Sequence, residues 1–252
     1  MARRIVITSG KGGVGKTTVT AFLGAYLASK GKRVVLLDLD FGLNNLDVSV
    51  GVEDKVIYDI IDAVEGRCRV KQAIIDCAQK NLFVIPSCHT FSLGINAQSV
   101  KLLIEGLSSS FDFILIDCPA GIDSGFTRSI SCANEAIVVV NPTLQSLRDA
   151  DKVLTILKSY ELDAVNLVVN RARRDLMRKG LTVNSKEIEN ILKTPILSTV
   201  YENDEILLSK NCCATKSRAL KYFKKLAESV INNAQNARDY TSVYGGLFKE
   251  KK

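Results

Sequence analysis

Residues 4–18 read RIVITSGKGGVGKTT. A short β-branched run, residues 4–8, leads into a loop that fits the pattern G-x-x-x-x-G-K-[ST], and a helix-period segment follows from Lys16 to Ser29. Between a strand and a helix this pattern is typical of a phosphate-binding loop, because its glycines let backbone N–H groups surround a phosphate and the helix N-terminus adds partial positive charge. We therefore predict a nucleotide-phosphate site near the start of the chain.

The side chains of this loop suit separate parts of that chemistry. We expect Lys16 to contact β- and γ-phosphate oxygens, the Thr17 hydroxyl to ligate Mg²⁺, and Thr18 to reach the α-phosphate. The residues predicted to bind the nucleotide here are Gly10, Lys11, Gly12, Gly13, Val14, Gly15, Lys16, Thr17 and Thr18.

Continuous apolar runs recur along the whole chain and alternate with helix-period segments. The runs are residues 4–8, 33–40, 82–86, 113–117, 136–140, 165–170 and 196–200. The predicted helices are Lys16–Ser29, Ala97–Leu107, Ser146–Leu157, Ser185–Leu192 and a final one near Lys216–Ala234. Apolar runs without alternation are typical of strands buried on both faces of a parallel sheet. The alternation of strands and helices predicts an α/β fold, a single-domain, doubly wound, mostly parallel sheet flanked by helices.

The end of the chain differs from its body in charge. Residues 1–209 carry 24 basic and 24 acidic side chains, whereas residues 210–252 carry 10 basic and 3 acidic ones and hold the whole net charge of +7. We divide the chain into a body of residues 1–234, a polar tether of residues 235–242, and a short basic and apolar tail of residues 243–252. A basic end favours an acidic partner surface, either anionic lipid or nucleic acid.

Composition argues against several other classes of protein. No apolar run approaches the roughly 18–20 residues that cross a bilayer, and the first residues lack the apolar region of an export signal, so we expect a cytoplasmic protein. The seven cysteines contain no C-x-x-C pair. Zinc and redox frameworks need such pairs, so we expect reduced, structural thiols.

Phosphate binding within one subunit does not require Lys11, because Lys16 already supplies the ammonium that contacts the phosphates. A second ammonium would be most useful on a phosphate bound by another subunit, as an arginine finger acts in trans. With Lys11 included, the loop reads K-G-G-x-G-K-[ST] and resembles the deviant Walker A signature of the P-loop ATPase family that includes MinD, ParA and the nitrogenase iron protein. The resemblance implies an ATP-dependent homodimer with facing sites, in which Lys11 acts across the interface.

Four further stretches resemble the MinD branch of this family. They are LDLDFGLNNLD (37–47), DCPAGI (117–122), NPTLQSLRDADKVL (141–154) and VNRARR (169–174). The resemblance implies that Asp38 and Asp40 face the γ-phosphate, with Asp40 orienting the attacking water. It also implies that Asp117 holds Mg²⁺ through water, that Asn45 lies on the dimer face, and that Asn170 reads the adenine edge.

These assignments form five sets of candidate residues. The catalytic set is Lys11, Lys16 and Asp40, and the metal set is Thr17, Asp38 and Asp117. Asn170 and Arg171 join the loop in binding the nucleotide. The dimer and partner set is Lys11, Asn45, Arg148, Asp149 and Asp151, and the membrane set is Val243, Tyr244, Leu247, Phe248 and Lys249.

Three functions remain open at this point. The first is a MinD-type ATPase using ATP and Mg²⁺, whose dimer brings two tails to anionic lipid on the inner face of the cell membrane, positions the division site, and is released on hydrolysis. Its implied regulators are an inhibitor of the MinC type and an activator of the MinE type. The second is a ParA-like partitioning ATPase that binds DNA, although DFGLNNLD differs from the Asp-Pro-Gln motif of that branch. The third is an iron–sulfur carrier or reductase of the same fold that pools Cys118 and Cys132 in a dimer. The C-x-x-C of the scaffold members is missing here, and reductases carry their ligands in differently patterned segments.

Overall fold

The computed structural model describes residues 1–42, 45–88, 96–214 and 218–232. Within these residues the strands form one sheet in the order β3-β4-β2-β5-β1-β6-β7-β8. The strands are β1 Arg3–Thr8, β2 Val34–Asp38, β3 Ile75–Asp76, β4 Leu82–Ile85, β5 Phe113–Asp117, β6 Glu135–Val140, β7 Ala164–Ala172 and β8 Ile196–Tyr201. All pairings are parallel except that of β3 with β4, so the predicted mostly parallel sheet is confirmed.

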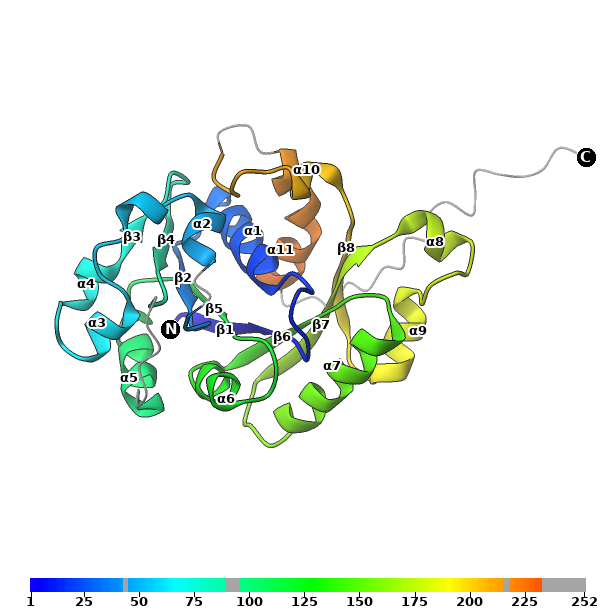
Figure 1. Cartoon of the computed structure of the whole chain (residues 1–252), viewed down its shortest axis with the longest axis horizontal. Helices are drawn as coiled ribbons and strands as arrows, with labels where there is room; N and C mark the ends of the chain where they lie inside the picture. Colours follow the sequence, from blue (N-terminus) through cyan, green and yellow to red (C-terminus); the bar gives the residue numbers. More distant parts are fainter. Residues whose placement is uncertain (43–44, 89–95, 215–217, 233–252) are drawn as a thin grey trace, which may run out of the picture.

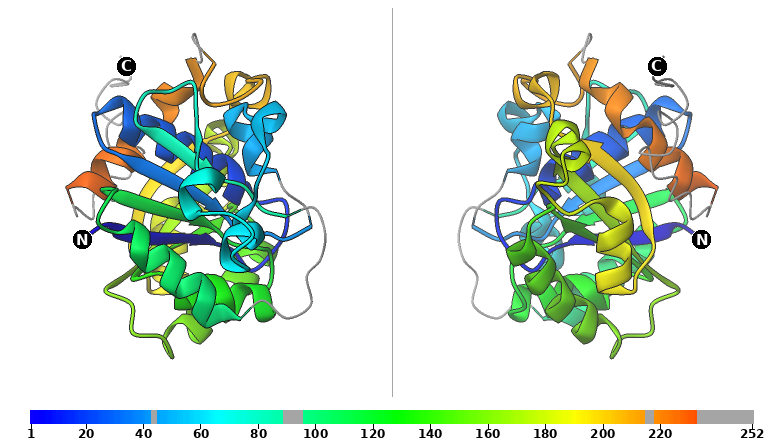
Figure 2. Two further views of the ribbon diagram at one scale, coloured as in Figure 1. Left: turned by 90° about the vertical axis from the view of Figure 1, so that its left-hand side faces the viewer. Right: turned by 90° about the vertical axis from the view of Figure 1, so that its right-hand side faces the viewer.

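Helices cover both faces of this sheet. Figure 1 shows α1 (Lys16–Ser29) and α11 (Lys224–Ile231) on one side, and α5 (Ala97–Leu107), α6 (Ser124–Ser131) and α7 (Leu144–Leu157) on the other. The two end-on views of Figure 2 show the same layers. The remaining helices are α2 Leu46–Val50, η1 Glu53–Lys55, α3 Ile60–Val64, α4 Val70–Ala73, α8 Arg174–Arg178, α9 Ser185–Leu192, α10 Asp204–Leu207 and η2 Arg218–Phe223.

Each face of the sheet has its own apolar core, because side chains alternate along the strands. In β1, Ile5 and Ile7 pack in the core beneath α1 and α11, whereas Val6 packs in the core beneath α5, α6 and α7. The strands read as unbroken apolar runs since both faces are covered. The buried sheet thus holds the strand ends rigidly, and those ends carry the candidate site.

The predicted final helix, Lys216–Ala234, differs from the structure. Residues 218–223 form the 3₁₀ helix η2, and the α-helix begins at Lys224. A 3₁₀ turn aligns side chains three residues apart, which places Leu220 and Phe223 together against the core beside α1. Phe223 stacks on Phe22 of α1 with ring centroids 4.9 Å apart. The 3₁₀ geometry of η2 is therefore associated with the packing of Phe223 on α1.

The predicted tether and tail, residues 235–242 and 243–252, lie outside the described residues. The membrane set Val243, Tyr244, Leu247, Phe248 and Lys249 consequently stays a sequence prediction. Among the helices that the structure does describe, none combines the length and apolar character needed to cross a membrane.

Candidate functional site

The carboxyl ends of the parallel strands meet at one edge of the sheet, and most of the candidate residues lie there. β1 leads directly into the phosphate loop, β2 ends at Asp38, β5 ends at Asp117, and Asn170 lies near the end of β7. Asp38 and Asp117 are register partners on adjacent strands. This edge is where open α/β sheets bind their ligands. The fold thus brings together side chains from four separate parts of the sequence.

The phosphate loop ends at a helix N-terminus that is free to bind an anion. Gly15 adopts the left-handed region with φ 97° and is the N-cap of α1. In the structure as described, no side chain caps this helix, and no acidic residue lies in its first turn. The first N–H groups of a helix have no partners within it, so they and the helix dipole attract negative charge.

Two close contacts fix the backbone of the loop. Asn170 is buried, and its Nδ2 donates to the carbonyl of Val14 at 2.8 Å. A Cβ at Gly15 would collide with the same amide, and one at Gly10 would collide with the backbone of Asp149 in α7. Glycine is therefore required at both positions. The loop is held by β7 on one side and touches α7 on the other.

The centre of the site pairs a lysine with a buried carboxylate. Lys16 and Asp117 are both buried, and the hydroxyls of Thr17 and Thr20 donate to Asp117, the latter at 3.3 Å. Burial raises the pKa of Asp117 to about 6, while Thr17 and the Lys16 ammonium oppose the rise. Asp117 is thus a desolvated carboxylate that an added cation would stabilise.

Two more carboxylates lie at the end of β2 and two residues beyond it. Asp38 is buried, and its two oxygens accept the backbone N–H groups of Asp40 at 2.9 Å and Leu46 at 3.3 Å. Burial, and then the charge of Asp117, raise the pKa of Asp38 well above its usual range. Burial also raises the pKa of the half-buried Asp40, against the opposing charge of Lys16. Among the described residues, these three carboxyl groups therefore lie in one cluster with a single buried ammonium, that of Lys16.

This donor set fits Mg²⁺ held together with a nucleotide. No group of three or more His, Cys, Asp or Glu side chains within the described ranges could hold a metal alone. Mg²⁺ keeps several waters and is commonly bound through one or two carboxylates plus substrate phosphates. The Thr17 hydroxyl beside Asp117 supplies that kind of partial ligand set. The oxygens of Asp38 already accept two N–H groups, so its metal role stays a prediction.

The remaining candidates lie around this centre on the surface. Lys11 is exposed, and no described residue pairs with its ammonium, whereas its carbonyl accepts the Ser9 hydroxyl at 2.8 Å. Asn45 is exposed as the N-cap of α2. Arg171 is exposed in the left-handed region with φ 53°. Of the α7 set, Arg148 and Asp151 are exposed, and Asp149 is half-buried, 3.8 Å from Lys152. Their binding roles stay predictions.

The structure adds residues that the sequence analysis missed. Thr20 contacts Asp117 from one turn beyond Lys16, and its spacing of four residues on a helix was the available signal. Asp123, the N-cap of α6, acts on Asp40 by raising its pKa. The contact between Gly10 and Asp149 has no sequence signal, because it depends on where α7 packs.

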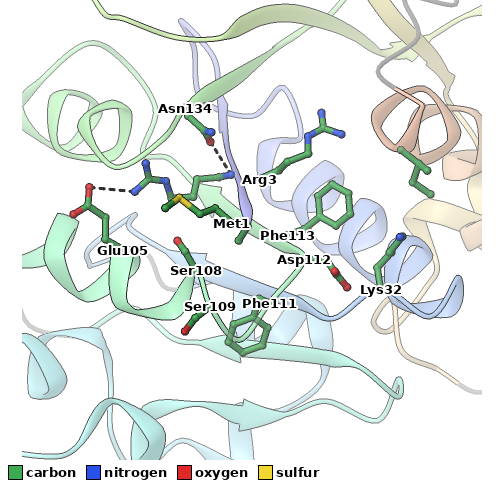
Figure 3. Close-up of a pocket in the computed structure, with 13 residues that line it drawn as sticks. Met1, Arg3, Lys32, Glu105, Ser108, Ser109, Phe111, Asp112, Phe113 and Asn134 are labelled. Carbon is green, nitrogen blue, oxygen red and sulfur yellow. Dashed lines mark hydrogen bonds and ion pairs between the residues drawn. The ribbon is translucent and has the colours of Figure 1, made fainter.

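A cavity of about 950 Å³ lies at the opposite edge of the sheet. Its lining includes Arg3, Lys32, Glu105, Asp112 and Asn134 (Figure 3). Because Arg3 begins β1 and Phe113 begins β5, the cavity is at the amino ends of the strands, away from the phosphate loop. It is therefore separate from the nucleotide site.

Comparison with known proteins agrees with this geometry. A family model described as an AAA domain matches residues 2–169. The septum site-determining protein MinD of Bacillus subtilis (strain 168) is 40% identical over 243 residues, covering 93% of this chain and 91% of that protein. The MinC:MinD cell division protein complex of Aquifex aeolicus matches with a TM-score of 0.84 at 34% identity, covering 92% of this chain and 97% of the other. MinD complexed with Mg-ADP from Pyrococcus horikoshii OT3 matches with a TM-score of 0.80 at 30% identity, covering 91% and 96%. The chain therefore belongs to the MinD family of septum-site determining ATPases.

Proposed function

We propose that this chain is a Mg²⁺-dependent ATPase that dimerises with ATP, binds the inner face of the cell membrane to position the division site, and is released when ATP is hydrolysed. The observation that carries the proposal is Lys11. It lies on the phosphate loop, yet it is exposed, and its ammonium has no partner in the described part of the chain. A lysine on the phosphate loop whose ammonium is exposed and unpaired is suited to contact the phosphate bound by a second copy.

The buried residues supply the hydrolytic chemistry in this proposal. Lys16 and the N–H groups at the start of α1 hold the phosphates, and Asp40 orients the attacking water. Thr17 and Asp117 would hold Mg²⁺, which would neutralise charge that develops on the phosphates. Lys11 from the second copy would stabilise the charge that develops on the transferred group.

Partner binding is assigned to α7, which touches the phosphate loop. Gly10 packs directly on the backbone of Asp149, and exposed Arg148 and Asp151 lie beside it. We propose that α7 in the dimer contacts a regulator of the MinC type, the kind of partner present in the Aquifex aeolicus complex. An activator of the MinE type would use the same face.

Membrane binding is assigned to the tail, residues 243–252. Burying Leu247 and Phe248 contributes roughly 1.5–3 kcal/mol each at most. Each nearby lysine adds about 1 kcal/mol on an anionic surface. One tail is therefore marginal, and dimerisation makes two tails effective together.

The test is co-sedimentation of the full chain with phosphatidylglycerol-containing vesicles in ADP and in ATP, with duplex DNA as competitor. We expect binding only with ATP and Mg²⁺, weakened by salt and unaffected by DNA. Removal of residues 243–252, or Phe248→Glu, should abolish it while ATP-driven dimerisation persists. Asn190→Glu makes the same charge change on the exposed face of α9 and should bind like the original chain. Sedimentation of the truncated chain in ATP would contradict the membrane role, and preference for DNA would favour the partitioning function.

A further inference from the structure

Three of the seven cysteines come together at a place unrelated to the nucleotide. Cys77 follows β3, whereas Cys212 and Cys213 lie between α10 and η2. The sulfurs of Cys212 and Cys213 are 3.7 Å apart, and the thiols of both Cys77 and Cys212 are hydrogen-bond partners of Cys213. All three are free thiols. The cluster joins segments that are distant in sequence.

Backbone contacts hold the cluster in place. The N–H of Cys212 donates to the carbonyl of Ser49 at 2.9 Å, at the end of α2. The N–H of Cys213 donates to Oδ1 of Asn211 at 3.0 Å. On the other side, the N–H of Cys77 donates to the carbonyl of Leu82 at 3.0 Å within the β3–β4 hairpin. Figure 1 shows α2 and the β3–β4 hairpin on the same side of the molecule as α10. The backbone of all three cysteines is therefore held by hydrogen bonds.

The three thiols are chemically unequal. Hydrogen bonds with Cys212 and then with Cys77 lower the pKa of Cys213 to about 4, because neighbouring S–H groups can stabilise its thiolate. The same hydrogen bonding, together with burial, raises the pKa of Cys77 and of Cys212. Cys213 and Cys77 are half-buried, whereas Cys212 is only 3% exposed. One nucleophilic sulfur and one neighbouring thiol are thus both accessible.

We infer that Cys213 is a reactive thiol that exchanges with small disulfides, and that Cys77 resolves the product to give a reversible Cys77–Cys213 disulfide. In the first step the Cys213 thiolate attacks one sulfur of a small disulfide RSSR, forming Cys213–S–S–R and releasing RS⁻. Cys77 then loses its proton to solvent and attacks the Cys213 sulfur, releasing the second RS⁻. Two protein thiols are oxidised, and one RSSR is reduced to two RSH.

Geometry favours Cys77 over Cys212 as the resolving thiol. Consecutive Cα atoms are about 3.8 Å apart across a trans peptide, which is shorter than the roughly 4.4–6.8 Å that an ordinary disulfide spans. Cys212 and Cys213 are consecutive, and no cis peptide is present in the described residues. Cys77 comes from another segment and carries no such restriction. The low-pKa sulfur of Cys213 is also a good leaving group, so the disulfide is readily reduced again.

The test treats the reduced full chain with oxidised glutathione and follows the products by mass spectrometry and peptide mapping. We expect a product lighter by two hydrogen atoms, with Cys77 and Cys213 in linked peptides. Between pH 5 and 8 the first step should be nearly independent of pH. At pH 5 it should be faster than at Cys68, because the gain in thiolate fraction outweighs the lower intrinsic nucleophilicity.

Variants separate the two roles. Cys77→Ser should stop at the glutathione adduct on Cys213, whereas Cys212→Ser should still form the disulfide. Cys68→Ser is the matched control, a half-buried cysteine elsewhere, and should behave like the original chain. If a variant fails to fold, peptide mapping of the unaltered chain still identifies which cysteines react. Adducts spread evenly over Cys68 and Cys213, a Cys212–Cys213 product, or a first step that slows tenfold for each unit of falling pH would overturn the inference.

Discussion

The two edges of the sheet differ in how their charged side chains are paired. At the amino edge, Arg3 is paired with Glu135 through two contacts of 2.6 Å, donates to the carbonyl of Val230, and lies over the ring of Phe113. Arg4 contacts Glu105 at 3.3 Å. Among the described residues of the carboxyl edge, the buried carboxyl groups of Asp38 and Asp117 outnumber the one buried ammonium, and their pKa values are raised. The charges at the amino edge are paired within the protein, whereas those at the carboxyl edge would be balanced by a charged ligand.

Charges at the two edges therefore distinguish a structural cluster from a binding site on the same sheet. The strands are apolar and buried along their length, so any charge at their ends is desolvated. Evolved structures pair such charges, and unpaired ones are concentrated where a ligand binds. The excess of carboxylates near Lys16 therefore marks the same ligand-binding site as the phosphate loop.

Lys16→Ala should have the largest effect, because it removes the buried ammonium of the carboxyl edge. Charged hydrogen bonds contribute about 1.5–3 kcal/mol each, so the loss of contacts to two phosphates predicts ATP binding weaker by about 10²- to 10⁴-fold. Isothermal titration with ATP and Mg²⁺ measures this. Lys11→Ala should bind ATP nearly as well as the original chain but fail to dimerise by size exclusion. Equal loss of ATP affinity in both variants would place Lys11 within its own site.

Asp40→Ala should slow hydrolysis without weakening ATP binding. A residue that orients the attacking water accelerates the reaction typically by about 10²–10⁴-fold. We expect turnover reduced at least ~100-fold, together with a dimer that persists in ATP by size exclusion. Asp123→Ala, a neighbouring carboxylate not assigned to water, is the control and should keep most of the activity. An Asp40→Ala chain that binds ATP yet remains monomeric would refute this role.

Much of the fold followed from the sequence because its elements are long and strongly patterned. The helices Lys16–Ser29, Ala97–Leu107 and Ser185–Leu192 and the strand 113–117 have the predicted bounds. The two-residue strand β3 and helices of four or five residues are too short to show a period. The capping box Asp59–Asp62, which begins α3, was a usable signal that the apolar pattern did not reveal.

The site was predictable where it depends on chain order and unpredictable where it depends on packing. Residues at strand ends, such as Asp38 and Asp117, converge because parallel strands share one edge. The contact of Gly10 with α7 and the meeting of Cys77 with Cys213 depend on loop paths that no local pattern encodes. These tertiary contacts are also the ones that link the site and the thiol cluster to distant segments.

Asp117→Asn tests whether the carboxyl edge is destabilising without its ligand. Folding raises the pKa of Asp117 from 3.8 to about 6, so between these values the folded chain binds more protons and its stability falls as the pH rises. At about 1.4 kcal/mol per unit, the neutral variant should be more stable by about 1–3 kcal/mol at pH 7. Urea unfolding at pH 4 and pH 7 should show the gain only at pH 7. The variant should lose Mg²⁺-dependent hydrolysis, and a loss of stability at pH 7 would contradict the account.

The smallest effect is expected at the amino edge, where Glu135→Gln removes one partner of a completed pair. The Arg3–Glu135 pair is partly exposed, with side chains 26% and 14% accessible, so solvent screens it. Arg3 keeps its contacts with Val230 and Phe113, and the glutamine can still accept one N–H. We therefore expect a loss of about 1 kcal/mol in urea unfolding and no change in ATP affinity or turnover. Arg3→Met and the double variant complete a cycle that isolates the pair from the packing of the arginine stem. If Glu135→Gln instead weakens ATP binding, the two edges are coupled through β1 and β6, and their separation into a structural and a ligand-binding edge fails.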